Sequence, residues 1–256
     1  MTTEERRAAL EAIAAEVRVC DRCRLAQGRT NAVPGEGDPD TEVVFIGEGP
    51  GQNEDRQGRP FVGAAGSLLE ELLGMIGWKR DDVFITNVVK CRPPNNRDPE
   101  ADEIAACEPF LRRQLEVLDP ALLVTLGRFS LQTFMPGDRI GRVHGTERVI
   151  DPDTGARAAT GYALYHPAAA LRQGSLKETM QRDMANVPEV LIRARTERSQ
   201  ASASEPAPTA PPQTSAAATR GPSEALESND TPTAEPAAEP PESDAMKTPD
   251  DQIGLF

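Results

Sequence analysis

Four short apolar segments, separated by helical patterns, limit what this chain can fold into. They are rich in β-branched or aromatic residues and bounded by turn residues, as buried parallel strands are: EVVFIG (42–47), VFITNVV (83–89), ALLVTLG (121–127) and YALYHP (162–167). Residues 67–77 and 98–118 have apolar side chains at helical spacing, and we expect Asp98 as N-cap and Pro99 as first residue of the second helix. The alternation predicts an α/β fold, a three-layer αβα sandwich around a mostly parallel four-stranded sheet.

Unusual residues stand at the carboxyl end of each predicted strand. They are the glycine loop after Gly47, the segment 87–94, Gly127 and the turn 165–167. In open α/β sheets, ligands bind beyond the carboxyl ends of the strands. The pattern therefore predicts one ligand site at this edge of the sheet.

The loop GEGPGQNEDRQGRPFVGAAG (47–66) lacks the signatures of common phosphate-binding loops. It has neither the Gly-Lys-Ser/Thr of a P-loop nor a GxGxxG followed at once by a helix. It carries Glu48, Glu54 and Asp55, which repel phosphate, and it is predicted to run for over a dozen residues before a helix. A plain glycine-bearing connection is the alternative, but long loops in compact domains are usually functional or disordered.

Cysteine spacing predicts a metal centre. The chain starts with an amphipathic, charged helix pattern instead of a signal peptide, and no run of about 18 apolar residues suggests a membrane span. In an intracellular chain, four cysteines favour a metal over disulfides. Structural zinc usually shows two short-spaced pairs, whereas only one pair is short here, so a 4Fe-4S cluster fits better than zinc. Four unrelated core cysteines are the third alternative. The candidate ligands are Cys20, Cys23, Cys91 and Cys107.

The composition changes sharply at Ser199. Residues 199–251 are mainly Pro, Ala, Ser, Thr and Glu, and ordering them would cost backbone entropy without apolar burial, so we expect a disordered acidic linker. Residues 199–256 contain ten Asp or Glu and two Lys or Arg, a charge of −8, which leaves −5 of the total −13 for the domain expected over residues 1–198.

Several separate motifs resemble the iron-sulfur uracil-DNA glycosylases of family 4. In order from about Cys20 to Arg193, they are the CxxC pair with its two later cysteines, GEGPGQNEDRQGRPFVGAAG, FITNVVKCRPPNNRDP and YHPAAALR. The resemblance implies a DNA repair enzyme that flips uracil out of single- or double-stranded DNA and hydrolyses its N-glycosidic bond, leaving an abasic site. It also implies that the four cysteines hold a 4Fe-4S cluster. We expect a cytoplasmic, nucleoid-associated monomer with no membrane contact.

The resemblance assigns roles to the strand-end residues. Phe61 stacks on the flipped uracil, and the Asn87 amide pairs with uracil N3–H and O4, which cytosine presents in reverse. His166 stabilises the departing uracil anion, and Glu48 stands on the water or sugar side of the pocket. Taken singly, Phe61 would be an ordinary core aromatic and Asn87 a turn residue. The implied substrate-binding residues are Gly47, Gly49, Pro50, Gly51, Phe61, Asn87 and Lys90.

The remaining expectations concern DNA contacts. Leu171 is predicted to fill the space of the flipped base, while Arg172 and Lys177 contact phosphates, although such a charge pair is more often solvated surface. Lys90 is expected to neutralise phosphate or to support its loop. His144 lies in RIGRVHGTERV, a basic stretch predicted to be hairpin-like, and is expected to face solvent or phosphate.

Small departures from the family pattern bear on the mechanism. Gly49 stands where family members commonly have Ala, and Ala170 where a second Leu is common. The segment CRPPNNRDPE lacks the basic insertion whose histidine captures DNA covalently in a related branch, so hydrolytic turnover is expected. The alternative function is a catalytically idle iron-sulfur nucleic-acid-binding module tethered to the replication machinery; the joint presence of Phe61, Asn87 and His166 argues against it.

The last residues differ from the linker that precedes them. Gln252, Leu255 and Phe256 in QIGLF resemble the bacterial sliding-clamp pentapeptide Gln-Leu-x-Leu-Phe. We therefore expect residues 252–256 to bind a sliding clamp. A chance apolar terminus is the alternative.

Overall fold

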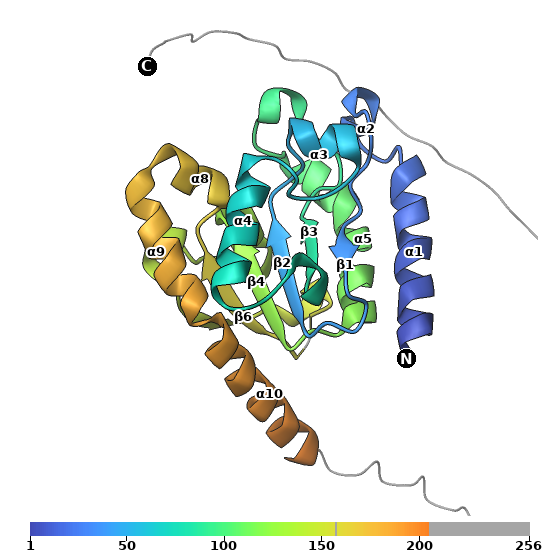
Figure 1. Cartoon of the computed structure of the whole chain (residues 1–256). Helices are drawn as coiled ribbons and strands as arrows, with labels where there is room; N and C mark the ends of the chain where they lie inside the picture. The colour runs from blue at the N-terminus through green and yellow to red at the C-terminus, as the bar shows by residue number, and fades with distance from the viewer. Residues whose placement is uncertain (157, 205–256) are drawn as a thin grey trace, which may run out of the picture. The chain divides into compact units, whose positions relative to one another are not determined.

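The structure, a computed structural model, describes residues 1–156 and 158–204 (Figure 1). Within these residues a six-stranded sheet has the order β1-β3-β2-β4-β6-β5. Its parallel centre consists of β3 (Phe84–Asn87), β2 (Val43–Gly47), β4 (Leu122–Leu126) and β6 (Thr160–Leu164). Two short antiparallel strands, β1 (Glu36–Gly37) and β5 (Glu147–Val149), form the edges.

The predicted α/β architecture is confirmed, but the strand count was wrong. The four predicted strands are the four parallel ones, and the sheet is a six-stranded mixed sheet. The added edge strands are two and three residues long and are not buried throughout, so they carry no apolar run that a sequence pattern could reveal.

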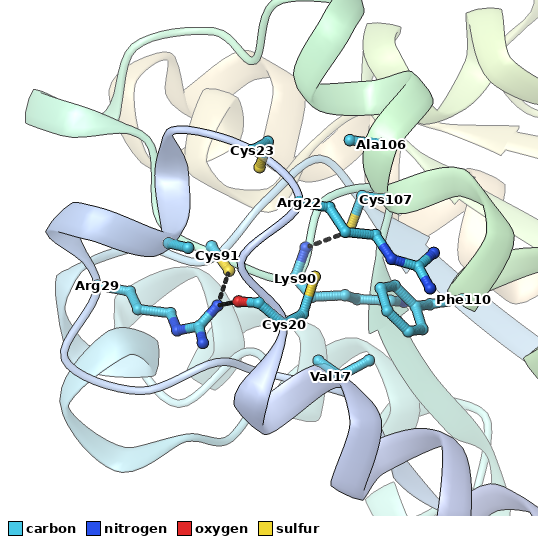
Figure 2. A pocket seen from close by; sticks show the side chains of 11 residues that line it. Val17, Cys20, Arg22, Cys23, Arg29, Lys90, Cys91, Ala106, Cys107 and Phe110 are labelled. Carbon is cyan, nitrogen blue, oxygen red and sulfur yellow. Dashed lines mark hydrogen bonds between the residues drawn. The ribbon is translucent and has the colours of Figure 1, made fainter.

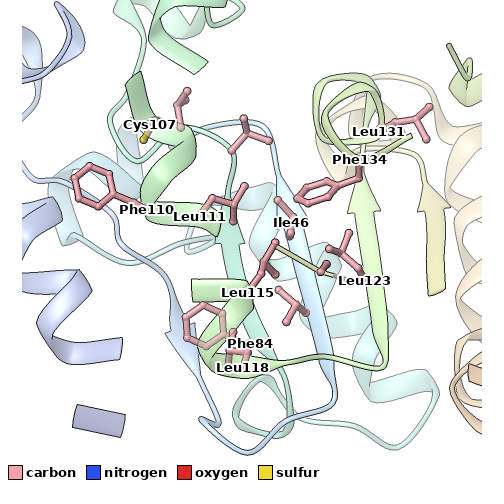
Figure 3. Close-up of a cluster of buried hydrophobic side chains, with 14 of the residues drawn as sticks. Ile46, Phe84, Cys107, Phe110, Leu111, Leu115, Leu118, Leu123, Leu131 and Phe134 are labelled. Atoms are coloured by element: carbon pink, nitrogen blue, oxygen red, sulfur yellow. The ribbon is translucent and has the colours of Figure 1, made fainter. Parts of the chain in front are cut away.

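Helices cover both faces of the sheet (Figure 1). Alternate residues of β2 enter different cores: Val44 and Ile46 pack on one face, and Val43 and Phe45 on the other. The first core contains side chains of α1 (Thr3–Val19), α5 (Ala101–Leu118) and α6 (Arg128–Phe134), part of which is shown in Figure 3. The second contains side chains of α4 (Ala64–Met75), α9 (Gly174–Ala185) and α10 (Val187–Ser204). The predicted three layers follow from this arrangement.

Short elements fill the connections. The helices are α2 (Leu25–Gly28), α3 (Gln52–Gln57), α7 (Ile140–Val143) and α8 (Pro167–Arg172). The 3₁₀ turns are η1 (Arg80–Asp82), η2 (Pro94–Asn96) and η3 (Pro152–Thr154). Because α3 begins at Gln52, the glycine loop does not run unstructured for over a dozen residues, which corrects that prediction.

Two helix boundaries also differ from the prediction. The N-cap of α5 is Glu100, not Asp98, because Glu100 and Glu103 form a reciprocal capping box that Asp98 lies too early to make. Helix α10 continues to Ser204, so the predicted linker does not begin at Ser199. Residues 199–204 contain no proline, whereas Pro206 follows closely. The rest of the predicted linker, 205–251, and the motif 252–256 lie outside the described residues.

No helix among the described residues has the length and apolarity needed to cross a membrane.

Candidate active site

The carboxyl ends of the four parallel strands open into one pocket of about 540 Å³. Glu48 follows β2, Asn87 ends β3, Gly127 follows β4 and His166 follows β6, and all four line it. The chain crosses from β3 on one side of β2 to β4 on the other, so the pocket lies where the strand order reverses. Its volume is in the range of about 300–1,000 Å³ typical of small-molecule sites.

The pocket brings together most of the predicted site residues. Its lining includes Glu48, Gly49, Pro50, Gly51, Phe61, Asn87, His166 and Arg172. Gly47, Lys90, Leu171 and Lys177 are not part of the lining.

The ring of Phe61 is held in the pocket by an unusual backbone. Phe61 has φ +51°, in the left-handed region that a bulky side chain rarely adopts. The buried Glu54 carboxylate stabilises this turn, because its Oε1 accepts from the N–H groups of Val62 (2.9 Å) and Gly63 (2.8 Å). Glu54 therefore organises the loop. The sequence predicted only that its negative charge repels phosphate, whereas the structure also gives it this structural role.

Arg80 fixes the same turn from its carbonyl side. Its guanidinium donates to the carbonyl oxygens of Phe61 (2.9 Å) and Pro60, and to Glu36 Oε1 (2.7 Å). Gly66 permits close packing, because a Cβ there would stand 1.8 Å from the Phe61 carbonyl oxygen. The position of the Phe61 ring is thus set by Glu54, which binds the N–H groups that follow it, and by Arg80, which binds the carbonyl oxygens of Pro60 and Phe61.

Asn87 presents an unsatisfied polar atom to the pocket. It is 1% exposed, and its Oδ1 has no hydrogen-bond partner among the described residues. Gly47 makes room for it, because a Cβ at Gly47 would lie 2.4 Å from Asn87 Oδ1 and 2.6 Å from the Phe61 ring. A buried acceptor without a partner is costly, and this oxygen can accept a hydrogen bond from a molecule bound in the pocket.

His166 is held as a neutral ring with a defined tautomer. Its Nδ1 accepts from the N–H of Ala168 (3.1 Å), which leaves the hydrogen of the neutral imidazole on Nε2. Burial lowers the pKa of His166 to about 4; Arg172 lowers it further and Glu54 opposes the shift. The ring centroid is 5.8 Å from that of Phe61, and Gly127 (φ +93°) allows the approach because a Cβ there would meet His166 Cβ at 2.9 Å.

Glu48 is the pocket carboxylate that titrates near neutrality. Burial raises its pKa to about 7, and the charge of Asp98 raises it further, while Arg128 lowers it. Asp98 and Arg128 form an ion pair with each other and also line the pocket. Glu48 can therefore exchange a proton at physiological pH.

Lys90 does not contact the pocket. It is 1% exposed, and its ammonium group donates to Thr86 Oγ1 (2.6 Å), the Asn87 carbonyl oxygen (2.8 Å) and Gln114 Oε1 (2.8 Å). Burial lowers its pKa to about 7. Of its two predicted roles, phosphate neutralisation is wrong for this buried group, whereas its bond to the Asn87 carbonyl supports the loop.

Two further surface predictions change in the structure. Lys177 pairs with Glu71 (2.9 Å), so it is not a free phosphate contact. His144 is only partly exposed (28%): its Nδ1 lies 2.7 Å from Asp183 Oδ2 and its ring centroid 4.8 Å from that of Tyr165. The segment before it forms α7, not an arm of a hairpin, and Asp183 comes from α9, too far along the sequence for a local pattern to reveal.

The pocket also contains residues that the sequence did not assign to the site. They come from the loop after Cys91 and from the ends of β4 and β6, and include Asn96, Arg97, Asp98, Arg128 and Tyr165. Tyr165 lies within the predicted segment 165–167, and Arg128 directly follows Gly127, so the strand-end rule could have included both. Arg97 is held by the buried Glu103 (2.6 and 2.8 Å), which shapes this wall.

The four cysteines line one separate cavity (Figure 2). Two N–H donors address their sulfur atoms: Arg29 Nη1 lies 3.2 Å from Cys91 Sγ, and the backbone N–H of Lys90 lies 3.2 Å from Cys107 Sγ. Burial raises the pKa of the Cys107 thiol to about 11 and also raises that of Cys91, which Arg29 partly offsets.

The cysteine cavity does not have the geometry of a single-ion site. Among the described residues, no three Cys, His, Asp or Glu side chains are close enough together to hold one metal ion. A tetrahedral zinc site needs all its sulfur atoms about 2.3 Å from one centre.

Comparison with known proteins gives a consistent result. Residues 34–187 match the Uracil DNA glycosylase superfamily. The chain is 49% identical over 189 residues to the type-4 uracil-DNA glycosylase of Sulfurisphaera tokodaii, a match that covers 72% of this chain and 85% of that protein. It is 47% identical to the type-4 enzyme of Saccharolobus solfataricus (71% and 86% covered) and 46% identical to that of Thermotoga maritima (65% and 85% covered).

Proposed function

Because the chain belongs to the uracil-DNA glycosylase superfamily, we propose that it removes uracil from DNA by hydrolysing the N-glycosidic bond, as a base excision repair enzyme. One observation carries the proposal: the unpartnered Asn87 amide, the Phe61 ring and the neutral His166 ring line the same pocket. A flipped base needs an aromatic face and a polar partner for its Watson-Crick edge. Acting on DNA, the enzyme would work at the nucleoid of a bacterial cytoplasm.

Base selection rests on Asn87 in this proposal. Asn87 Oδ1 accepts from uracil N3–H, which satisfies its buried, unpaired oxygen, and the amide nitrogen donates to uracil O4. Cytosine has an acceptor at N3 and a donor at N4, so Asn87 Oδ1 would face an acceptor and the amide nitrogen would face a donor. Phe61 stacks on the base and is kept rigid by Glu54 and Arg80.

Cleavage requires stabilisation of the departing uracil anion. His166 donates through Nε2–H to uracil O2, because Nδ1 already accepts from Ala168. The ring remains neutral above about pH 4, so it donates this hydrogen bond as a neutral imidazole. Glu48, as a carboxylate above its pKa of about 7, orients the attacking water.

We assign a 4Fe-4S cluster to the four-cysteine cavity. Its four thiols and the two N–H donors directed at sulfur fit such a group. When bound, the cluster supplies a cross-link between the end of α1, the loop after β3 and α5. The loop from Cys91 to Asp98 continues directly into the pocket wall.

Leu171 is the proposed wedge. It lies on α8, whose N-cap is His166, and is 52% exposed. A side chain in this position can enter the duplex while His166 acts on the extruded base.

The function is tested with a uracil-containing single-stranded oligonucleotide followed by alkaline cleavage of abasic sites. We expect product with the wild-type protein and a rate about 10–100-fold lower for Asn87→Asp, because the ionised side chain loses the donor to O4. Asn87→Asp is also expected to release cytosine, because a protonated carboxyl offers the reversed donor and acceptor. The exposed Asn186→Asp serves as control.

Absence of product from cluster-loaded wild-type protein would favour the idle nucleic-acid-binding module. An unchanged uracil rate in Asn87→Asp would remove Asn87 from base recognition.

The C-terminal motif, although outside the described residues, extends the proposal to a sliding clamp. Gln252, Leu255 and Phe256 supply the polar and apolar anchors of a clamp-binding peptide. We expect calorimetric titration of a peptide ending in DQIGLF to show binding to the cognate bacterial clamp, and a peptide with Leu255→Ala and Phe256→Ala to show none. Equal binding of both peptides, or binding of neither, contradicts a specific anchor.

A further inference from the structure

Three exposed arginines have no partner in the described part of the chain. The side chains of Arg139, Arg142 and Arg172 form no hydrogen bond, ion pair or ring contact with residues 1–156 and 158–204. Exposed cations elsewhere are commonly neutralised, as Arg7 is by Glu4 and Lys177 by Glu71. The three arginines are therefore available to an external anion.

These arginines lie in, or next in sequence to, segments that line the active-site pocket. Arg172 lines the pocket itself. Arg139 and Arg142 stand on either side of Ile140 in the sequence, and Ile140 lines the same pocket. The next residue, Gly141, lies close to the pocket residue Tyr165, since a Cβ there would be 3.9 Å from the tyrosine oxygen. We call Arg139, Arg142 and Arg172 the rim arginines.

The backbone that carries Arg139 and Arg142 is firmly held. Val143 is buried, and the N–H of Gly145 donates to the Ala163 carbonyl oxygen of β6 (2.8 Å). His144 pairs with Asp183 and packs on Tyr165. The arginine side chains are free while their Cα positions are fixed, so binding them to a ligand costs side-chain entropy and little backbone entropy.

Charge around the pocket makes such a rim necessary. Residues 1–198 carry −5, which repels a polyanion, and the pocket itself contains three carboxylates. Two of these are engaged, Asp98 by Arg128 and Glu54 by backbone N–H groups. The charge of Arg128 is therefore neutralised by Asp98 within the protein. Among the described residues, the arginines left without a partner are the rim arginines, which lie in or next to the segments that line the pocket.

We propose that Arg139, Arg142 and Arg172 form a phosphate-binding rim that grips the DNA backbone beside the extruded nucleotide. The proposal rests on DNA being the substrate, and it assigns α7 a role in binding that adds to the base pocket. Phosphate contacts of this kind set affinity and position without reading sequence.

The test measures how affinity depends on salt. Full-length wild-type protein and the variant Arg139→Gln/Arg142→Gln are titrated by fluorescence anisotropy into a uracil-free oligonucleotide, single-stranded and as a duplex. Each lost contact reduces the slope of log K against log salt by about 0.7 on a single strand and about 0.9 on a duplex. We expect the double variant to lose about 1.4 on the single strand, so that over a fourfold rise in salt the wild type loses about sevenfold more affinity than the variant.

Arg7→Gln removes a single charge from the exposed surface of α1 and controls for loss of positive charge away from the pocket. Its slope is expected to equal that of the wild type. A double variant whose slope equals that of Arg7→Gln on both substrates overturns the rim.

The result is separable from the glycosylase assignment, because the probe contains no uracil. A reduced slope supports the rim even if no uracil is released. An unchanged slope in a protein that does release uracil contradicts the rim alone. Because both side chains are exposed, the variants should unfold at the wild-type midpoint, and a circular dichroism melt checks this.

Discussion

Replacing His166 with alanine is expected to lower the single-turnover rate of uracil release by about 10–1,000-fold, with a smaller effect on DNA affinity. The reason is that Nε2–H is the donor left free by the Ala168 contact, so its loss removes a hydrogen bond that strengthens as negative charge develops on uracil. Rapid-quench measurement with enzyme in excess isolates this step. Equal losses in rate and in affinity would indicate a binding role instead.

The pH profile separates His166 from Glu48. Glu48, with a pKa of about 7, is expected to give a rate that rises as its carboxylate forms through neutral pH. His166, with a pKa of about 4, is already neutral across this range. The rise should therefore persist in His166→Ala and disappear in Glu48→Gln.

Loss of one cysteine is expected to remove the cluster and destabilise the fold. The purified protein should be brown, and Cys91→Ala should lose its visible absorbance. If the cluster stabilises as a disulfide cross-link does, by about 2–5 kcal/mol, and each kcal/mol shifts the midpoint of a domain this size by about 2–4 °C, the melting temperature should fall by about 4–20 °C. Iron and sulfide analysis with a thermal melt measures both effects.

Val89→Ala is a matched control for the cysteine variant. Val89 is buried two residues before Cys91, so its truncation should also lower stability but leave the absorbance intact. A colourless wild-type protein that contains one zinc would overturn the cluster assignment. So would a Cys91→Ala protein with undiminished iron and colour.

The strands and the place of the site could be predicted because their signals are local. Segments such as EVVFIG are apolar throughout because parallel strands are buried on both faces, and turn residues mark where each one ends. The rule that ligands bind at the carboxyl ends of such strands then placed Glu48, Asn87 and His166 at one edge. The structure puts all three in one pocket.

Contacts between residues distant in sequence decided the rest. The sequence allowed Lys90 a role in phosphate binding, but its ammonium group is buried and donates to Thr86 and Gln114. His144 pairs with Asp183, which lies on α9. Edge strands of two and three residues exist only because β3 and β6 offer them backbone partners.

The sequence by itself determined the α/β layers, the edge of the sheet that holds the site, and the cysteines that share a cavity. Only the tertiary structure decided the chemical state of the site. A neutral His166 follows from burial and from the Ala168 contact, and an available Asn87 oxygen follows from the lack of any described partner. The strained Phe61 turn exists because Glu54 and Arg80 satisfy its peptide groups from two different segments. Protonation, orientation and strain depend on what surrounds a side chain in space, and periodicity along a chain reports only which face of an element is buried.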